Sequence, residues 1–260
     1  MPFTSKRTDR RDHYLPQGYL RGFIDPTREK EPQPLWRLDL RHNLWRQKST
    51  KEVGHLKGLY DYAGELAGIE IADTSFSALE DGFTPVREAL ISGGFRDWAE
   101  HRDFLLQYMQ MLRARSALFL HQAEAEGESL QTLTVKEVSA DGKSIAVESM
   151  VPKPPPRNFI RNRALTLMRK EIEASTSWLD KFNWSLKWCD SVTDPFVSCD
   201  SPFVATGPIA HSSIKAALDH PQTELLFPVC WQACLFGSRN GADGGTARIG
   251  AQALREVRRL

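Results

Sequence analysis

The chain has 260 residues, 41% of them hydrophobic and 26% charged, with a formal net charge of +1. This composition is typical of a soluble domain, and so small a net charge excludes a bulk field toward nucleic acid or anionic membranes. No segment approaches the roughly 20 consecutive apolar residues of a membrane helix, and the first residues lack the apolar core of a signal peptide, so we expect a cytoplasmic protein.

The first patterned segment, residues 12–23, combines polar and apolar side chains at helical spacing. If Pro16 starts a helix, His13 lies just before it, while Gln17 and Arg21 share one face. The apolar residues of the segment fall elsewhere on the same turns. The helix therefore has one side to bury and one side to use.

A β-hairpin signal follows. Residues 35–40 alternate in polarity, residues 41–43 form a turn, and residues 44–48 return as a second strand. Trp36 and Trp45 are candidates to pair across the two strands.

Two long stretches with helical spacing come next. The first spans residues 64–83 and ends before Pro85, and the second runs from about residue 95 to about Glu126. The second is apolar over many turns, so we expect it to be central.

Two charged residues interrupt these apolar stretches. Glu70 lies between two isoleucines, where it is either exposed on the outer face or buried beside a cationic partner. Arg113 lies within the second stretch, where it either forms a structural ion pair or holds a carboxylate or phosphate ligand.

The middle of the chain is expected to separate two halves of a single domain, 1–260. Residues 132–150 carry two alternating runs around an Asp-Gly turn and predict a hairpin, with a helix as the alternative. The proline-rich stretch 152–156 predicts a rigid connection. The two halves are then residues 1–151 and 157–260.

The C-terminal half predicts one helix followed by strands. The helix spans residues 159–181, and the strands span residues 184–188, 196–199, 225–229 and 231–236. Together with the first half, this order predicts an α+β fold in which several long helices pack with a small antiparallel sheet formed mainly by the C-terminal third.

The chain has four cysteines and no standard catalytic signature. We expect Cys189, Cys199, Cys230 and Cys234 to be buried free thiols and expect no metal site, because no Cys-x-x-Cys pair is present. The sequence also lacks a nucleophile elbow, a Walker loop and a dinucleotide fingerprint. The absence of these motifs excludes only the enzyme classes that they define.

Two separated motifs resemble a known family. The first is His-Tyr-x-Pro-Gln-x-x-Leu-Arg-x-Phe, formed here by His13, Tyr14, Pro16, Gln17, Leu20, Arg21 and Phe23. The second is Ser-Asp-x-Pro, which occurs here as Cys199-Asp200-Ser201-Pro202, with a cysteine in place of the usual serine. In this order and at this distance, the motifs resemble a bacterial domain family of unknown function, DUF4238, over nearly the whole chain. The resemblance implies a domain and no reaction, with further matches at Tyr60, Glu70 and Arg113.

The candidate site combines polar residues of the motifs with the arginine of the central helix. His13 and Asp200 are the catalytic candidates, because histidine transfers protons near neutral pH and aspartate orients it or holds a metal. Gln17, Arg21 and Arg113 are the substrate-binding candidates, with the arginines as clamps on a phosphate or another anion.

Tyr14 and Glu70 are further candidates for this site.

The sequence leads to three hypotheses about function. The first is an enzyme, such as a hydrolase, that acts on a phosphate-bearing substrate, either nucleotide or nucleic acid. The second is a non-catalytic interaction or sensor module in which the same residues form a structural network. The third is nucleic-acid binding through the basic stretch 157–170 without catalysis. The residues specify no cofactor, and the partners they suggest are a small anionic ligand or nucleic acid.

Overall fold

The computed structural model describes residues 11–24, 35–64, 74–130, 132–138, 145–153, 155–189, 195–206, 218–240 and 245–248. Glu70 and the predicted helical residues 65–73 lie outside this part of the chain. Among the described residues, no helix is both long and apolar enough to span a membrane.

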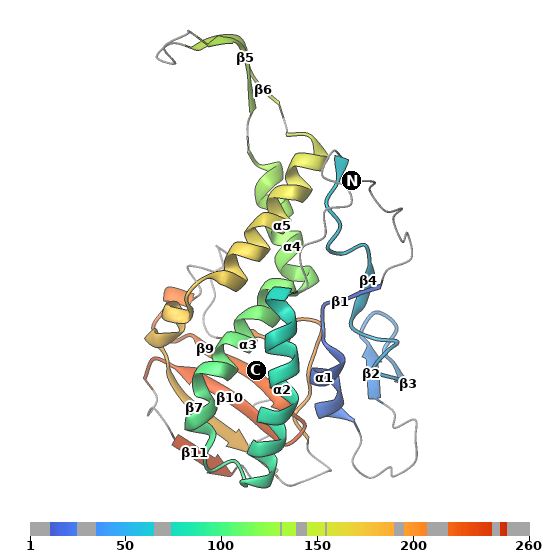
Figure 1. The fold of residues 1–260 in the computed structure, drawn as a ribbon, viewed down its shortest axis with the longest axis vertical. Coiled ribbons are helices and arrows are strands. Elements are labelled where there is room, and N and C mark those ends of the chain that lie inside the picture. The colour runs from blue at the N-terminus through green and yellow to red at the C-terminus, as the bar shows by residue number, and fades with distance from the viewer. Residues whose placement is uncertain are drawn as a thin grey trace.

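The helices form a layer in front of a sheet, and two of them continue upward from it (Figure 1). The α-helices are α1 Gln17–Leu20, α2 Thr74–Ser92, α3 Arg102–Arg115, α4 Ala117–Glu128 and α5 Arg157–Glu173. Short 3-10 turns extend three of them: η1 Arg21–Phe23 after α1, η3 Trp98–His101 before α3, and η4 Thr176–Lys181 after α5.

α2 passes through Pro85, so the predicted end before this proline was wrong. Pro85 is exposed, whereas Phe83 and Leu90 on the same helix are buried. A proline removes one backbone hydrogen bond and crowds the preceding turn. Burial of the apolar stripe on both sides of Pro85 outweighs that cost.

The predicted helix from about residue 95 to Glu126 is divided at Ser116, whose backbone is extended. The Ser116 hydroxyl donates to the Arg113 carbonyl oxygen at 2.7 Å and accepts from the Phe119 N–H at 3.1 Å. One serine therefore closes α3 and caps α4. The prediction that a helix continues to Lys181 was also too long, because α5 ends at Glu173.

The main sheet confirms the predicted α+β class. Its strands are β7 Asn183–Trp188, β8 Val204–Thr206, β9 Glu224–Cys230, β10 Ala233–Ser238 and β11 Gly245–Arg248, in the order β11-β7-β10-β9-β8. All neighbours are antiparallel except β11, which runs parallel to β7. The predicted strand at residues 196–199 is wrong, because in this segment only the Phe196 N–H reaches toward the sheet, donating to the Trp231 carbonyl oxygen at 2.7 Å.

Three two-stranded ribbons accompany the main sheet in the described part of the chain. They pair β1 Arg11–His13 with β4 His55–Lys57, β2 Leu35–Asp39 with β3 Leu44–Lys48, and β5 Thr132–Val138 with β6 Ile145–Lys153. Both predicted hairpins are confirmed, and the β5–β6 hairpin projects from the end of α4 and α5 (Figure 1). Trp36 is opposite Gln47, and Trp45 is opposite Leu38, so the two tryptophans are diagonal neighbours across the two strands.

An aromatic cluster joins α1, α2, α3 and the sheet. The Phe83 and Tyr108 rings stack at a centroid distance of 4.0 Å, and the Tyr19 and Phe227 rings stack at 5.9 Å. All four side chains are fully buried. The opening helix is therefore part of the main core and not an appendage.

Gly237 on β10 makes room for the buried Trp184 indole, since a Cβ at this position would lie 2.9 Å from two of its ring carbons. We predict that Gly237→Ala lowers the free energy of unfolding by about 1–3 kcal/mol, because overpacking displaces the ring. Urea denaturation measures the loss. Ser185→Ala on the neighbouring strand β7 is the control, and an equal change in both variants would contradict the packing argument.

Candidate functional site

The two sequence motifs meet in the folded chain. The Tyr14 hydroxyl donates to Asp200 Oδ1 at 3.0 Å, although the two residues are 186 positions apart. The buried Tyr19 hydroxyl donates to the Pro228 carbonyl oxygen at 2.8 Å and lies 2.9 Å from Ser198 Oγ. The opening segment is thereby fastened to the loop that carries Asp200.

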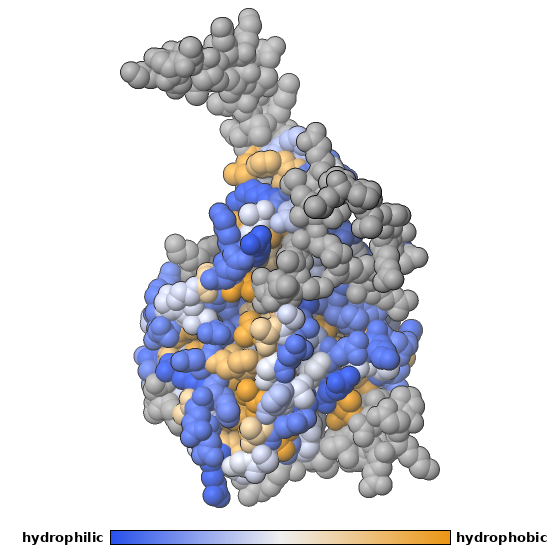
Figure 2. Space-filling view, viewed as in Figure 1, coloured by the Kyte–Doolittle hydropathy of each residue, from blue (hydrophilic) through white to orange (hydrophobic). Residues whose placement is uncertain are grey.

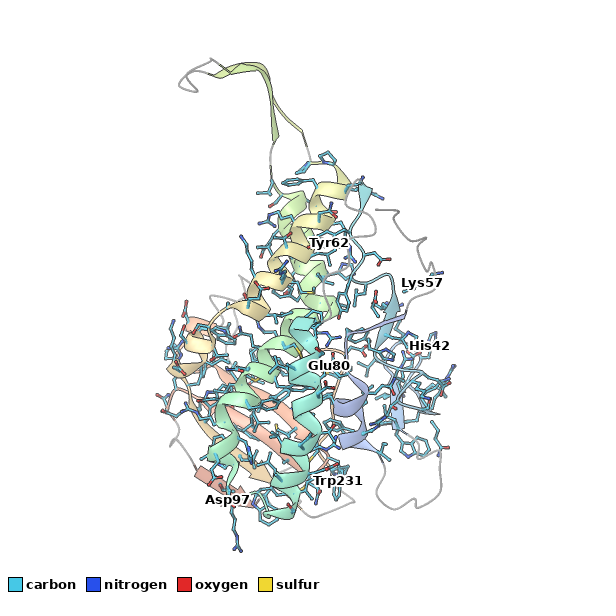
Figure 3. The ribbon with its side chains drawn as sticks, viewed as in Figure 1. His42, Lys57, Tyr62, Glu80, Asp97 and Trp231 are labelled. Atoms are coloured by element: carbon cyan, nitrogen blue, oxygen red, sulfur yellow. The ribbon has the colours of Figure 1, made fainter. Side chains whose placement is uncertain are left out.

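The motif segment is held from the helical side by Arg115, the last residue of α3. Its Nη2 donates to the His13 carbonyl oxygen at 2.5 Å, and its Nη1 forms an ion pair with Glu80 of α2. Glu80 lies on α2 beside the opening segment (Figure 3). The guanidinium also lies 4.4 Å from the centroid of the Phe76 ring. Arg115 is buried, so these partners compensate its desolvation.

Tyr60 and Asp12 extend this arrangement. Tyr60 donates from its hydroxyl to the Arg115 carbonyl oxygen at 3.2 Å, and Arg115 Nε lies 3.3 Å from the same hydroxyl. The Tyr60 N–H donates to the buried carboxylate of Asp12 at 3.2 Å. Burial raises the pKa of Tyr60, which keeps its hydroxyl protonated as a donor. We call Asp12, Tyr60, Glu80 and Arg115 the Arg115 network.

The His13 imidazole is half-buried and differs from this network. Its Nε2 is buried and has no hydrogen-bond partner among the described residues. Burial lowers the pKa of His13, and His55 and Arg115 lower it further, while Glu80 and a hydrogen bond with the Lys51 backbone oppose them. Since Nε2 is unpaired, Nδ1 makes the bond to Lys51, and the neutral ring presents a lone pair at Nε2. The His55 ring lies edge-on, 5.4 Å away between centroids.

Asp200 is exposed at its surface loop, and its carboxylate faces Tyr14. Burial raises the pKa of Tyr14, and the Asp200 charge raises it further. The phenol therefore stays protonated and donates. The positive charge of Arg37 acts in the opposite direction on the same hydroxyl, so the β2–β3 hairpin contributes to the electrostatics of this place.

The rest of the predicted opening helix extends away from His13. A Cβ at Gly18 would lie 3.0 Å from Thr84, and one at Gly22 would lie 3.3 Å from Arg87, so α1 and η1 run beside α2. Gln17 is half-buried at the start of α1, and the exposed Arg21 begins η1. From Glu80 to Arg87 a helix rises about 10 Å, which places Arg21 roughly two turns from His13.

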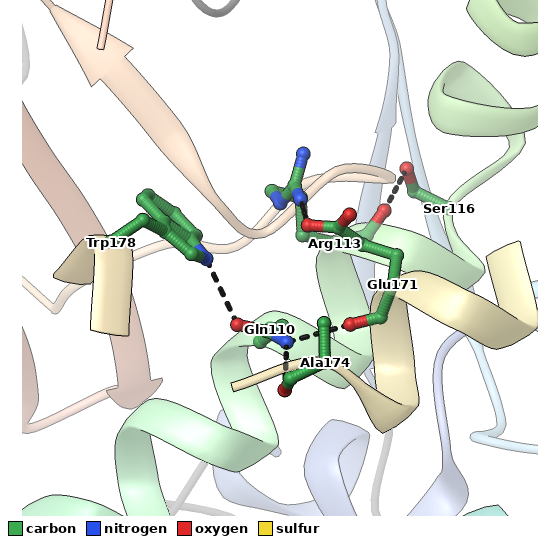
Figure 4. Close-up of polar contacts among 6 residues, drawn as sticks. All are labelled: Gln110, Arg113, Ser116, Glu171, Ala174 and Trp178. Atoms are coloured by element: carbon green, nitrogen blue, oxygen red, sulfur yellow. Dashed lines mark hydrogen bonds and ion pairs between the residues drawn. The ribbon is translucent and has the colours of Figure 1, made fainter. Parts of the chain in front are cut away.

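Arg113 belongs to a different network, between α3 and α5 (Figure 4). It forms an ion pair with Glu171, and its guanidinium lies 5.3 Å from the centroid of the Trp178 ring. Gln110 donates to the Glu171 and Ala174 carbonyl oxygens at 2.6 and 2.9 Å and accepts from the Trp178 indole at 3.0 Å. Arg113 here has the structural ion pair that the sequence left as one alternative.

Sequence reasoning did not select Arg115, Glu80 or His55, each of which contacts His13 or acts on its pKa. Arg113 and Arg115 are about 200° apart around a helix. They consequently face α5 and β1 respectively. In the sequence Arg113 lies between Leu112 and Ala114, whereas Arg115 is followed by Ser116. The signal that distinguishes them is Ser116, because the helix break places Arg115 at the end of α3.

The four cysteines form no disulfide bridge. Cys189, Cys230 and Cys234 are buried free thiols, as predicted, but Cys199 is exposed because its loop does not join the sheet. Within the described ranges, no three histidine, cysteine, aspartate or glutamate side chains converge on a metal position.

The fold and the site define a mixed α+β protein whose opening segment is fixed between a buried arginine and a C-terminal loop. The chain belongs to the family described as "Protein of unknown function (DUF4238)", whose model matches residues 11–246. Comparisons with curated proteins and with solved structures find no match.

Removal of Arg115 leaves Glu80 and the His13 carbonyl oxygen without their partner. We predict that Arg115→Ala lowers the free energy of unfolding by about 3–5 kcal/mol, as for other broken buried ion pairs. Urea denaturation of the full chain measures this. Arg169→Ala is the matched control, because the Arg169–Glu173 pair on α5 is exposed and should contribute nothing measurable. Equal stability of the two variants would contradict the role given to Arg115.

Proposed function

We propose that this protein is an enzyme in which His13 transfers a proton during a reaction on a phosphate-bearing substrate, either nucleotide or nucleic acid. The observation that carries the proposal is the buried Nε2 of His13, which has no partner among the described residues. A buried polar atom left unsatisfied costs about 1–3 kcal/mol. Among the unpaired buried side-chain atoms of the described residues, such as Trp98 Nε1 and the Tyr108 hydroxyl oxygen, Nε2 of His13 is the one that belongs to a ring able to transfer a proton near neutral pH.

The electrostatics of His13 suit a general base. Burial and the neighbouring His55 and Arg115 lower its pKa, so the ring is neutral at pH 7. A neutral imidazole accepts a proton from water or from a substrate hydroxyl and returns it to a leaving group. In this proposal Nε2 accepts the proton, and Nδ1 keeps its hydrogen bond to the Lys51 backbone.

The position of His13 is fixed from two sides, which supports a catalytic role. Arg115 binds its carbonyl oxygen, and the Lys51 backbone binds its ring. Fixed donors and acceptors lower the barrier because they need no reorganisation during the reaction. The buried Arg115 network thus serves as support, and only the imidazole reacts.

Asp200, Gln17 and Arg21 complete the proposed site as substrate-facing residues. The exposed Asp200 carboxylate, oriented by Tyr14, orients a water or a substrate group. Gln17 offers an amide at the start of α1. Arg21 lies about 10 Å from His13 along the direction of α1 and η1, so it pairs with a phosphate of a substrate longer than one nucleotide.

A second candidate is a non-catalytic interaction or sensor module. The observation in its favour is that the Arg115 network and the Arg113–Glu171 pair are buried or half-buried ion pairs with partners in place. In that version His13 is a packing residue beside His55. The two candidates differ in what the loss of the imidazole does: one loses turnover, the other only stability.

The test is turnover of the full chain on a panel of nucleotides and single-stranded DNA and RNA. We predict that His13→Gln lowers kcat/KM by about 100-fold or more, since it removes the base. His121→Gln, at an exposed histidine of α4, is the control and should retain full activity. Because the pKa of His13 lies below its ordinary value of 6.5, wild-type kcat/KM should rise with pH to a midpoint below 6.5 and then level off.

Unfolding temperatures of both variants show whether a loss of turnover reflects a loss of folding. Turnover by His13→Gln equal to that of the wild type would contradict the proposal. So would a wild type that is inactive on the whole panel.

A further inference from the structure

The β2–β3 hairpin carries an exposed aromatic face. Trp36 and Trp45 are 45% and 56% exposed. Their register opposite Gln47 and Leu38 places both on the same face as diagonal neighbours, about 7–8 Å apart. Two tryptophans on one side of a narrow ribbon form a surface on which flat rings can stack.

The same hairpin is strongly basic compared with the whole chain. Between Leu35 and Lys48 the cations are Arg37, Arg41, Arg46 and Lys48, and the only acidic residue is Asp39. The hairpin thus carries a charge of +3, whereas the chain as a whole carries +1. The surface over β2 and β3 is mainly hydrophilic (Figure 2).

Arg37 and Arg46 are placed directly opposite each other on the second face of the ribbon. Both are exposed, and in the part of the chain that the structure describes neither pairs with a carboxylate. Like charges directly across two strands are destabilising. An anion bound between them would remove that repulsion.

Proteins bind single-stranded nucleic acid through two elements: aromatic side chains on which the bases stack, and cations that bind the phosphate backbone. Neighbouring strands are about 4.8 Å apart, so a ribbon of two strands is narrow. An arginine side chain that starts on one face is long enough to extend past the edge of such a ribbon toward the other face. A phosphate backbone can follow that edge while its bases stack on the indoles.

We infer that the β2–β3 hairpin binds single-stranded nucleic acid, with bases stacked on Trp36 and Trp45 and phosphates paired with Arg37 and Arg46. The charge of Arg37 acts on the Tyr14 hydroxyl, so this arginine of the hairpin lies near the Tyr14–Asp200 contact. A bound strand would thus lead to the proposed site. The inference names the substrate class of that site and to this extent rests on the proposed function, but binding itself requires no turnover.

The experiment measures binding separately from catalysis. Fluorescence anisotropy of a labelled oligothymidylate of about 12 nucleotides is recorded with the full chain carrying His13→Gln, so that no strand is cleaved. We expect the dissociation constant to rise with salt concentration, as phosphate contacts require. In this background, Trp45→Ala should weaken binding about fivefold or more, and Arg37→Ala and Arg46→Ala should each lower the salt slope by about 0.7.

Two matched controls exclude a general effect of surface changes. Ile91→Ala removes another exposed large apolar side chain, on α2, and Arg96→Ala removes another exposed cation. Arg96 is next to Asp97, which lies far from His42 of the hairpin turn (Figure 3). Both controls should bind as tightly as the parent.

No association at low salt would overturn the inference, and so would equal weakening by the hairpin variants and the controls. Binding lost in the hairpin variants supports it even if the wild type turns over no substrate. In that case the proposed enzymatic function is contradicted, whereas the proposed binding site on the hairpin is supported. If the protein turns over free nucleotides but does not bind the oligonucleotide, the proposed enzymatic function is supported and the proposed binding site on the hairpin is contradicted.

Discussion

The fold depends on the burial of one guanidinium. Arg115 ends α3 inside the protein, where a charge without partners would cost several kcal/mol. Its partners come from three separate parts of the chain: Glu80 on α2, the carbonyl oxygen of His13 on β1, and Tyr60 after β4. Because the charge requires all of them, the opening segment has one position against the helices. The Tyr14–Asp200 and Tyr19–Pro228 hydrogen bonds then fasten the other side of this segment to the C-terminal part.

This constraint explains why the polar residues of the chain divide into groups with different roles. The Arg115 network and the Gln110–Arg113–Glu171 contacts connect helices to neighbouring segments through hydrogen bonds and ion pairs. The Arg115 network binds the backbone of His13, but Nε2 of the imidazole makes no hydrogen bond to it. The charged hairpin beside Tyr14 is likewise left outside, with Arg37 opposite Arg46. In the proposed function, the unpaired ring nitrogen accepts a proton and the exposed cations of the hairpin bind the phosphates of the substrate.

Much of the fold follows from sequence pattern, because periodicity and turn chemistry act locally. The α+β class, both hairpins and strands β7, β9 and β10 were predicted from alternation and turn residues. Two predicted helix boundaries were wrong because each depends on a single residue. Ser116 divides an apolar segment that has helical spacing throughout, and Pro85 does not end the helix that contains it. For the site, the motifs identified His13, Tyr14 and Asp200, of which Tyr14 and Asp200 meet. Helical spacing did not tell which of two nearby arginines faces β1, since the answer depends on the partners that tertiary packing supplies to each. The role of every predicted site residue stays a proposal.

The central claim is that the His13 ring is neutral at pH 7, with an unpaired Nε2, and that Arg115 and the Lys51 backbone fix its position. Nitrogen-15 NMR of the histidine rings during a pH titration tests this most directly, because it reports the tautomer and the pKa of each ring. The account predicts that His13 is protonated on Nδ1 alone at pH 7 and titrates below 6.5, the ordinary value for histidine. A proton on Nε2 at pH 7, or a pKa above 6.5, would contradict it.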